Sequence, residues 1–364
     1  MKVHVVDPSA YTPPYDHALC AALAAAGLDV ELYTSRFAYA DAPAADGYAR
    51  HDLFYGLARG GPASPLRRAV KLAEHVPGML RYRAAAAGAD VVHFQWLALP
   101  QIDGLLLPRG RPLVLTAHDI LARDSTPGQR AAQRRLMARF DAVIAHSERG
   151  RDRLVGELGV DAQRAYAIPH GAFAHLAGLP AAALPAELEQ TDGPVVLCFG
   201  LIRPYKGLEV LLEAWRGVEG ARLWVVGLPR YEIAALRASA SPSVDWVTRF
   251  VSDDELAACF RRADLVVAPY LESEQSGVVA TALAFGSALV LTDVGGFGEV
   301  AAAAAAALVA PGDAGALREA ITRLLGDGAA RRALSAAAAE LAAGEWSWQR
   351  VAERTAALYR TLFS

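Results

Sequence analysis

Short apolar runs rich in β-branched residues alternate along the chain with longer segments rich in Ala, Leu and Arg. The first half carries five such runs, at 2–7, 29–34, 90–95, 112–119 and 142–147. Because these runs are apolar on both faces, they predict parallel strands that are covered by helices on both sides of a sheet. The segments between them, such as 16–27 and 127–140, have helical spacing. The first half therefore predicts a doubly wound α/β domain.

A second alternation of the same kind follows a segment rich in Pro and Ala. Its predicted strands lie at 194–200, 221–227, 244–250, 263–270 and 287–294. We expect an N-terminal domain over 1–176, a linker over 177–192 and a C-terminal domain over 193–342. The last segment, 343–364, is expected to form a helix that crosses back to pack on the first domain. The alanine run at 301–307 is expected to belong to a helix or loop of the second domain.

The pattern as a whole predicts an α/β protein with two facing Rossmann-like domains. A chain of 364 residues is longer than one hydrophobic core usually organises, which agrees with two domains. Ligands of such sheets bind at the carboxyl ends of the strands. Candidate functional residues are therefore sought in the loops that follow the strands.

Composition narrows the class of protein. Hydrophobic residues make up 54% of the chain and charged residues 21%, as in globular proteins. A net charge of −3 argues against a protein built mainly to bind nucleic acid. The three cysteines are too scattered for a disulfide framework or a metal motif, and neither a signal peptide nor a spanning segment is recognisable. We expect a cytoplasmic enzyme.

The loop after the first strand of the second domain carries two cations, Arg203 and Lys206. A planar guanidinium and a compact ammonium together suit the binding of a diphosphate and its stabilisation as it departs. The alternative is an ordinary solvated basic loop.

A later loop places acidic residues directly before a helix. Glu272 and Glu274 precede Ser276 and Gly277, where the helix is expected to begin. Amides at a helix N-terminus form an anion site, and a nearby carboxylate can accept hydrogen bonds from sugar hydroxyls. The alternative is a simple N-cap formed by Ser276.

Several ordered motifs together resemble the retaining glycosyltransferases of family 4, which have the GT-B fold. In the second half these are FGLIRPYKGLEVLLEAW, LWVVG, FVSDDELAACFRRADLVVAPY and SEQSGVVATALAFGSALVLTDVGGFGEV. In the first half they are AHD at 117–119, DAVIAHS at 141–147 and AIPHG at 167–171. The resemblance covers nearly the whole chain and implies hexosyl transfer from a UDP- or GDP-linked sugar to a sugar, lipid-linked or small-molecule hydroxyl.

The resemblance also implies roles for particular residues. Arg203 and Lys206 would hold the donor diphosphate, and Glu274 would contact the donor sugar. Gln275 lies beside it in the same loop. The amides of Ser276, Gly277 and Val278 would bind the distal phosphate, and Phe250 and Val251 would border the nucleobase.

Two positions depart from the family pattern. Ala282 stands where the family usually has a Glu that binds ribose, and the first loop, 7–17, lacks the usual pair of glycines. We therefore expect this loop to shape the acceptor site through Tyr15 and His17. The alternative for both residues is packing within the loop.

Further candidates follow strands of the first half. The resemblance places His118 near the reacting sugar as a catalytic residue, with Asp119 beside it at the acceptor. Trp96 could stack on a sugar face or pack in the core. His146 and His170 are interpreted as more ordinary structural residues.

No metal or other cofactor is expected. Asp253, Asp254 and Glu255 begin a helix, where acidic residues favour the N-terminal dipole, and no Asp-x-Asp follows an apolar strand. Fixed cations would replace a divalent ion, and the leaving phosphate would help deprotonate the acceptor without a protein nucleophile.

Basic residues gather on two predicted helices of the first half, the first of them interrupted by Pro77. These are Arg67, Arg68, Lys71, Arg81 and Arg83, and then Arg130, Arg134, Arg135 and Arg139. They are either solvated helix faces or a surface for anionic lipid at the inner membrane face or for a phosphorylated acceptor. Alternatives for the whole protein are a silent GT-B scaffold that binds nucleotide sugar and an isomerase or phosphorylase on this fold.

Overall fold

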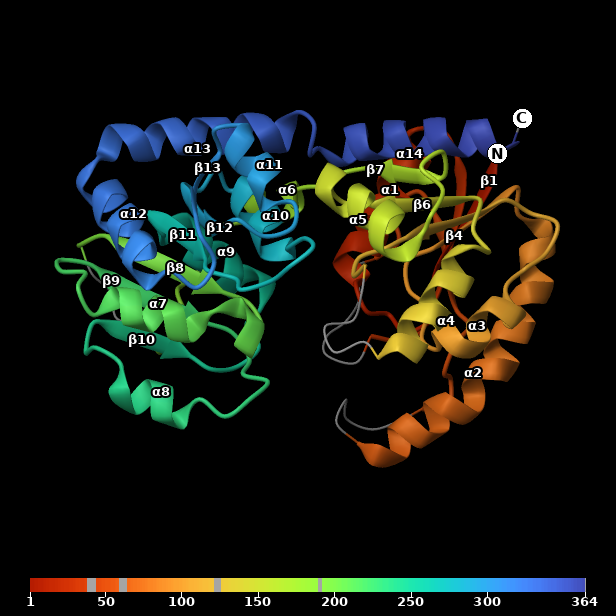
Figure 1. Ribbon diagram of the computed structural model, residues 1–364, viewed down its shortest axis with the longest axis horizontal. Helices are drawn as coiled ribbons and strands as arrows, with labels where there is room; N and C mark the ends of the chain where they lie inside the picture. The colour runs from red at the N-terminus through yellow and green to blue at the C-terminus, as the bar shows by residue number, and fades with distance from the viewer. Residues whose placement is uncertain (38–43, 59–63, 121–125, 189–191, 364) are drawn as a thin grey trace. The chain divides into compact units, whose positions relative to one another are not determined.

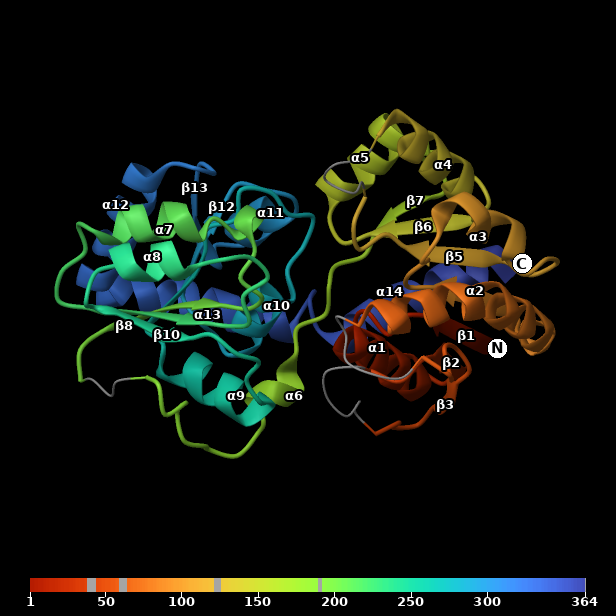
Figure 2. The ribbon, with the colours of Figure 1, turned by 90° about the horizontal axis from the view of Figure 1, so that it is seen from below.

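The computed structural model describes residues 1–37, 44–58, 64–120, 126–188 and 192–363. The chain forms two compact units. Unit 1 contains residues 1–171 and 348–364, and unit 2 contains residues 172–347. Each unit is built on one parallel sheet with helices on both faces (Figures 1 and 2).

Unit 1 has a seven-stranded sheet with strand order β3-β2-β1-β4-β5-β6-β7. Its strands are β1 (Lys2–Asp7), β2 (Asp29–Thr34), β3 (Ala49–Asp52), β4 (Val91–Phe94), β5 (Leu113–Thr116), β6 (Ala142–Ala145) and β7 (Ala165–Ala167). Its helices are α1 (Pro13–Ala25), α2 (Pro65–Ala85), η1 (Ala86–Gly88), α3 (Pro100–Leu106), α4 (Pro127–Met137), α5 (Glu148–Leu158) and α14 (Trp348–Phe363). The structure thus confirms the five predicted strands and adds two short strands at the sheet edges.

Successive residues of β1 point to opposite faces of the sheet and so join two different cores. Val3 and Val5 pack with α1 and α14, while Val6 packs with residues of α2, α4 and α5. Figures 1 and 2 show α1 and α14 on the same side of the sheet. The α2 helix runs through Pro77 without a break, so the expected interruption there was wrong.

Unit 2 has a six-stranded sheet with strand order β10-β9-β8-β11-β12-β13. Its strands are β8 (Val195–Phe199), β9 (Arg222–Val226), β10 (Val244–Val247), β11 (Leu265–Ala268), β12 (Leu289–Thr292) and β13 (Ala306–Val309). Its helices are α6 (Ala174–Ala177), η2 (Pro204–Lys206), α7 (Leu208–Trp215), α8 (Ala234–Ser239), α9 (Asp253–Arg262), α10 (Gly277–Ala284), α11 (Phe297–Ala302), α12 (Ala314–Gly326) and α13 (Gly328–Ala343). The strand order reverses beside β8, so β8 and β11 place their following loops at the ligand-binding edge typical of such sheets.

The alanine run at 301–307 is not simply a helix or loop, which corrects our expectation. Its first residues end α11, and Ala306 and Ala307 begin the edge strand β13. The strand signal comes from Leu308 and Val309, which follow the run. Among the described residues, no helix is both long and apolar enough to cross a membrane.

Candidate active site

The loop between β8 and α7 carries both predicted cations of unit 2. Arg203 is exposed and directly precedes the short helix η2. Lys206 is half-buried, and its Nζ lies 4.8 Å from the centre of the Tyr270 ring. Burial acts to lower the pKa of Lys206, but the neighbouring Tyr270 outweighs it and holds the pKa above 10.5. The ammonium is therefore charged at neutral pH.

Gly200 lets the backbone come close to this ammonium. Its φ of +107° is one that residues with a side chain rarely adopt. A Cβ at this position would lie 3.0 Å from Lys206 Nζ and 2.9 Å from a methyl group of Val278. A side chain at this position would therefore crowd both the cation and the first turn of α10.

The first turn of α10 forms an N-cap that is tied to the same tyrosine. The Ser276 hydroxyl accepts a hydrogen bond from the Val278 amide at 3.2 Å. The hydroxyl groups of Tyr270 and Ser276 are also 3.2 Å apart. Lys206, Ser276 and Val278 are thus brought together around Tyr270, although the Val278 amide already has its own cap as partner.

Glu274 lies on a loop whose backbone packs against the glycine pair Gly295 and Gly296. The backbone carbonyl of Glu274 accepts a hydrogen bond from the Gly296 amide at 3.1 Å. Gly295 has φ +47°, and a Cβ there would meet the Ser273 carbonyl oxygen at 2.1 Å. Glu274 and Gln275 are half-buried, whereas Glu272 is exposed. The sequence analysis missed this support, for which the Gly-Gly pair after β12 is the visible signal.

The residues expected at the nucleobase differ in exposure. The Phe250 side chain is 52% exposed and follows β10 by three residues. The Val251 side chain packs in the core of unit 2, so only its backbone remains to border a base. Ala282 is fully buried in the same core. A glutamate at position 282 would have to displace core packing.

In unit 1, His118 lies buried just beyond β5 in a cage of aromatic rings. The Trp96 ring stacks on it with the ring centres 5.0 Å apart, and the edge of Tyr15 meets it at 4.7 Å. His146 also hydrogen-bonds to it. Asp119, the next residue along the chain, is exposed. The structure therefore places His118 and Asp119 at the carboxyl edge of the sheet but turns the His118 ring inward.

Tyr15 and His17 lie in helix α1 and not in the first loop, through which we expected them to shape the acceptor site. Both side chains are buried in α1, Tyr15 against His118 and His17 against the Tyr48 hydroxyl, to which it hydrogen-bonds. Burial lowers the pKa of His17 to about 4. The reason is that α1 begins at Pro13, so both residues occupy the helix rather than the loop.

Tyr11 is the exposed aromatic residue of this loop, and the sequence analysis missed it. Its side chain is 61% exposed and contacts Trp96, with ring centres 5.2 Å apart. The Trp96 indole N–H donates to the Thr12 hydroxyl at 2.9 Å. Trp96 is half-buried and lies between Tyr11 and His118, in the packing role that its sequence position left open beside sugar stacking.

A buried carboxylate holds the first loop in place. Asp7 accepts hydrogen bonds from the amides of Ser9, Tyr11 and Thr12 at 3.1, 2.6 and 3.3 Å. Asp16, the first acidic residue of α1, lies next to it and is fully buried. Burial raises the pKa of both carboxyl groups, and more strongly that of Asp16. Here a carboxyl group and the amides that it accepts from hold a loop that contains no glycine.

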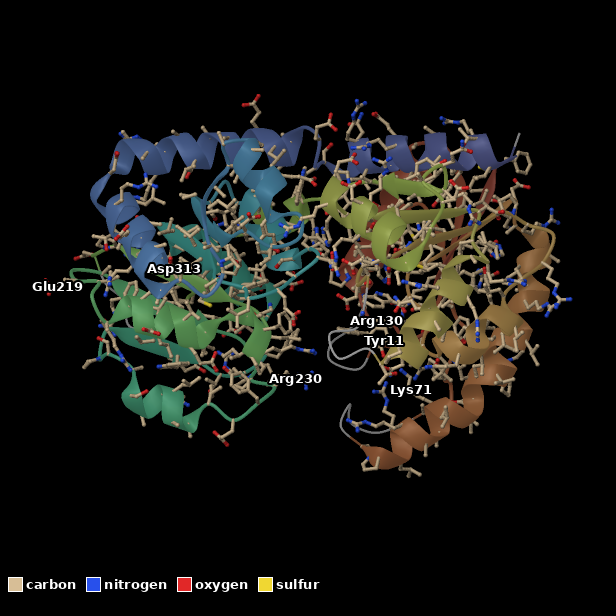
Figure 3. All side chains as sticks on the ribbon, viewed as in Figure 1. Tyr11, Lys71, Arg130, Glu219, Arg230 and Asp313 are labelled. Carbon is tan, nitrogen blue, oxygen red and sulfur yellow. The ribbon has the colours of Figure 1, made fainter. Side chains whose placement is uncertain are left out.

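A second feature of unit 1 is Lys71, whose ammonium lies above the ring of Tyr55. Lys71 Nζ lies 4.4 Å from the centre of the Tyr55 ring. The Tyr55 hydroxyl bonds to His75 at 2.7 Å, and His75 bonds to the buried Asp103 at 2.5 Å. Burial lowers the pKa of Lys71, and nearby Arg67 lowers it further. In the view of Figure 3, Tyr11, Lys71 and Arg130 lie along the same edge of unit 1.

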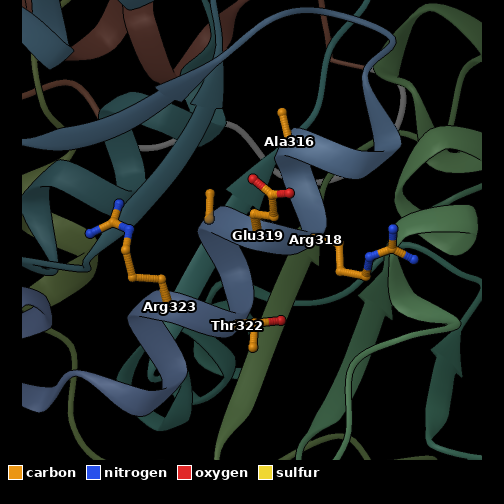
Figure 4. A pocket seen from close by; sticks show the side chains of 6 residues that line it. Ala316, Arg318, Glu319, Thr322 and Arg323 are labelled. Carbon is orange, nitrogen blue, oxygen red and sulfur yellow. The ribbon is translucent and has the colours of Figure 1, made fainter.

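The hollow in Figure 4 lies on a single helix, α12. Its lining residues are Ala316, Arg318, Glu319, Ala320, Thr322 and Arg323. No candidate residue lines this hollow, and none of its lining residues lies in a loop that follows a strand. We assign it no function.

Both halves of the chain match models of sugar-transferring enzymes. Residues 15–172 match the model described as Glycosyltransferase Family 4, and residues 193–327 match Glycosyl transferases group 1. A D-inositol 3-phosphate glycosyltransferase of Rhodococcus jostii is 30% identical over 309 residues, which cover 76% of this chain and 68% of that protein. The chain belongs to glycosyltransferase family 4.

Solved structures show the fold of this family 4 glycosyltransferase. A sucrose-phosphate synthase from Thermosynechococcus elongatus matches with a TM-score of 0.75 and 22% identity, over 100% of this chain and 99% of that one. Anabaena HepE in complex with UDP-glucose matches with a TM-score of 0.74 and 18% identity, over 100% of both chains. The glycosyltransferase therefore has the GT-B fold, as the motifs predicted.

Proposed function

We propose that this glycosyltransferase transfers a hexose from a UDP- or GDP-linked donor with retention of anomeric configuration. The observation that carries the proposal is the charged Lys206, which the close approach of Gly200 places beside the first turn of α10. A fixed cation and a helix N-terminus suit a diphosphate, whose charge grows as it leaves. HepE, which shares the fold, was solved with UDP-glucose. Phe250, exposed after β10, is proposed to contact the nucleobase.

We propose further that the donor diphosphate needs no divalent ion. Lys206 and the exposed Arg203 supply positive charge from one loop. Within the described ranges, no group of three or more His, Cys, Asp or Glu side chains is arranged to hold a metal ion. The leaving phosphate accepts the acceptor proton in this mechanism, so the protein contributes positioning and electrostatics.

The proposed donor site is tested by ligand-induced stabilisation. A ligand that binds only the folded state raises the melting temperature. We expect UDP or GDP, but not both equally, to raise it, and the matching nucleotide sugar to do the same with a chelator present. The measurement is a thermal shift across nucleoside diphosphates and their hexose conjugates. Equal, weak responses to every nucleotide would contradict a base-selective donor site, and a response that the chelator removes would contradict metal independence.

We propose that unit 1 binds an acceptor that carries phosphate. Lys71 offers a half-buried ammonium above Tyr55, close to the first loop, and Arg67 adds charge nearby. The Rhodococcus jostii relative is named for an inositol phosphate acceptor. An acidic group in a site of reduced dielectric would gain more from this ammonium than from exposed arginines. This favours a phosphorylated small molecule over anionic lipid as the partner of the basic helices.

Replacing Lys71 by alanine should raise the KM for a phosphorylated acceptor by about tenfold, since a hydrogen bond to a charged group is worth about 1.5–3 kcal/mol. The KM for the donor should be unchanged. Steady-state kinetics with inositol phosphates as acceptors measure both values. Arg81→Ala, on the same helix and exposed, is the matched control. An unchanged acceptor KM in Lys71→Ala would contradict a phosphate site at Lys71. Salt-sensitive binding to anionic vesicles that both variants lose equally would instead indicate a lipid surface.

A further inference from the structure

Buried polar residues stand in a row along the carboxyl edge of the unit 1 sheet. Gln95 directly follows β4, His118 follows β5 by two residues and His146 directly follows β6. Ile168 directly follows β7. Because β4, β5, β6 and β7 are neighbours in this order, the four residues lie side by side across the sheet edge. Gln95, His118 and His146 are exposed by only 1%, 2% and 6%.

Hydrogen bonds join the row from end to end. His146 Nδ1 lies 3.2 Å from the Ile168 carbonyl oxygen. His146 Nε2 lies 3.1 Å from His118 Nδ1. At the far end, His118 Nε2 lies 3.2 Å from Gln95 Oε1. Both ring nitrogens of both histidines therefore have a protein partner.

The Ile168 carbonyl at one end of the row determines which ring nitrogens of His146 and His118 carry a proton. A carbonyl oxygen only accepts, so His146 must carry its proton on Nδ1. Both rings are buried, and burial lowers the pKa of both histidines, so they are neutral at neutral pH. Neutral His146 then accepts at Nε2, and His118 must donate from Nδ1.

We propose that this row fixes His118 as its Nδ1–H tautomer, with Nε2 as an acceptor that faces the NH2 group of Gln95. The amide is then turned so that its nitrogen, not its oxygen, faces the ring, because two acceptors would repel. The other amide atom of Gln95 is buried and has no hydrogen-bond partner among the described residues. A buried NH2 group left without an acceptor costs more than a carbonyl oxygen in that place, which also favours this orientation.

Packing holds the His118 ring in this orientation. Trp96 stacks on its face with the two rings only 10° from parallel, and Tyr15 meets it edge-on. The Tyr15 ring also contacts His146 and His170. A 180° flip of the His118 ring would put carbon atoms in place of its two nitrogens and break both hydrogen bonds, so packing and hydrogen bonding together fix the ring orientation.

The consequence for catalysis rests on the proposed function. With Nε2 as an acceptor, His118 can take a hydrogen bond from a substrate hydroxyl that displaces the Gln95 amide, but it cannot donate one there. Gln95 and His146 are thus positioning residues for His118. Neither needs to touch the substrate.

The tautomer can be measured without any substrate. Two-bond 15N–1H correlation spectra of histidine-labelled, full-length protein at neutral pH distinguish a protonated from an unprotonated ring nitrogen. We expect His118, assigned by its loss in His118→Gln, to show a protonated Nδ1 and an unprotonated Nε2. A protonated Nε2, either alone or in an imidazolium, would overturn the proposal whether or not the enzyme is a glycosyltransferase.

Substitutions at the two ends should change this signature in different ways. Gln95→Glu replaces a donor by a carboxylate and should protonate His118 Nε2. His146→Phe keeps an aromatic ring at this position but removes the nitrogen that accepts from His118 Nδ1. Both tautomers of His118 should then be populated and interconvert. His51→Phe, on the edge strand β3 of the same unit, is the control and should leave the His118 signals unchanged.

Kinetics then separate a positioning role from a structural one. In His146→Phe we expect kcat for transfer or donor hydrolysis to fall about tenfold or more with an unchanged donor KM, as when the partner that orients a histidine is lost. If the variant misfolds, Gln95→Glu supplies the same test from the other end. An unchanged His118 tautomer in both variants would overturn the proposal. If both variants changed the His118 tautomer as expected but kept the wild-type kcat, only the positioning role would be refuted. If the wild-type protein bound no donor, the proposed function would be refuted instead.

Discussion

Replacing Lys206 by alanine should lower the rate of sugar transfer by about a hundredfold or more, the usual cost of losing one preorganised group that stabilises transition-state charge. Its ammonium is fixed over the Tyr270 ring, and its raised pKa keeps it charged. Because the leaving diphosphate carries more charge in the transition state than in the bound donor, kcat should fall more than donor affinity. The measurement is kcat and KM for the donor identified by thermal shift.

Two variants make this result specific. Lys206→Arg keeps the charge but not the compact ammonium, and it should recover only part of the rate. Lys71→Ala removes a half-buried lysine of unit 1 and should change the acceptor KM while leaving the donor KM intact. If Lys206→Ala transferred sugar at the wild-type rate, the diphosphate site would not be in this loop.

Much of the fold could be predicted because both faces of the central strands are apolar. The edge strand β3, with the sequence ARHD, lacks that pattern because most of its residues are exposed. The β13 strand was missed because alanine carries little strand propensity, and its place in the sheet depends on tertiary packing.

The sequence predicted which loops form the candidate site, but not the directions in which their side chains point. Lys206 and Ser276 were found because they follow β8 and β11. The close approach at Gly200 and the role of Tyr270 depend on contacts between these two loops, which no local pattern encodes. Tyr15 and His17 were misplaced since the start of α1 at Pro13, not the end of β1, decides which way they face.

Acidification should destabilise unit 1 selectively. Eight of the nine histidines lie in unit 1, and only His175 lies in unit 2. Burial lowers the pKa of His93 and His146 to about 3 and that of His170 to about 4, against 6.5 ordinarily. These groups are neutral when folded but become protonated in the unfolded chain below about pH 6.5. Their contribution to stability is therefore complete above that pH and is lost as the pH falls toward the folded-state values.

The size of the effect follows from about 1.4 kcal/mol per pKa unit. Between about pH 7.5 and pH 5, each of these three histidines should remove about 2 kcal/mol of unfolding free energy. Together they approach the stability of a typical domain, about 5–15 kcal/mol. The Asp7–Asp16 pair acts in the opposite sense: its raised pKa values lower stability as pH rises above 3.8. When folded, the pair binds at most two protons more than in the unfolded chain, whereas at least three histidines bind a proton only when unfolded, so loss on acidification prevails.

Hydrogen exchange read by mass spectrometry can follow both units in one sample. After correction for the intrinsic rate, peptides from β4, β5 and β6 should lose protection at about pH 5, while those from β8, β11 and β12 serve as the internal control. His93→Gln, which removes one titrating ring that bonds to Thr116 and Tyr359, should reduce the pH dependence although it also lowers stability at neutral pH. Equal loss of protection in the two units would show that the buried histidines of unit 1 do not set its acid stability.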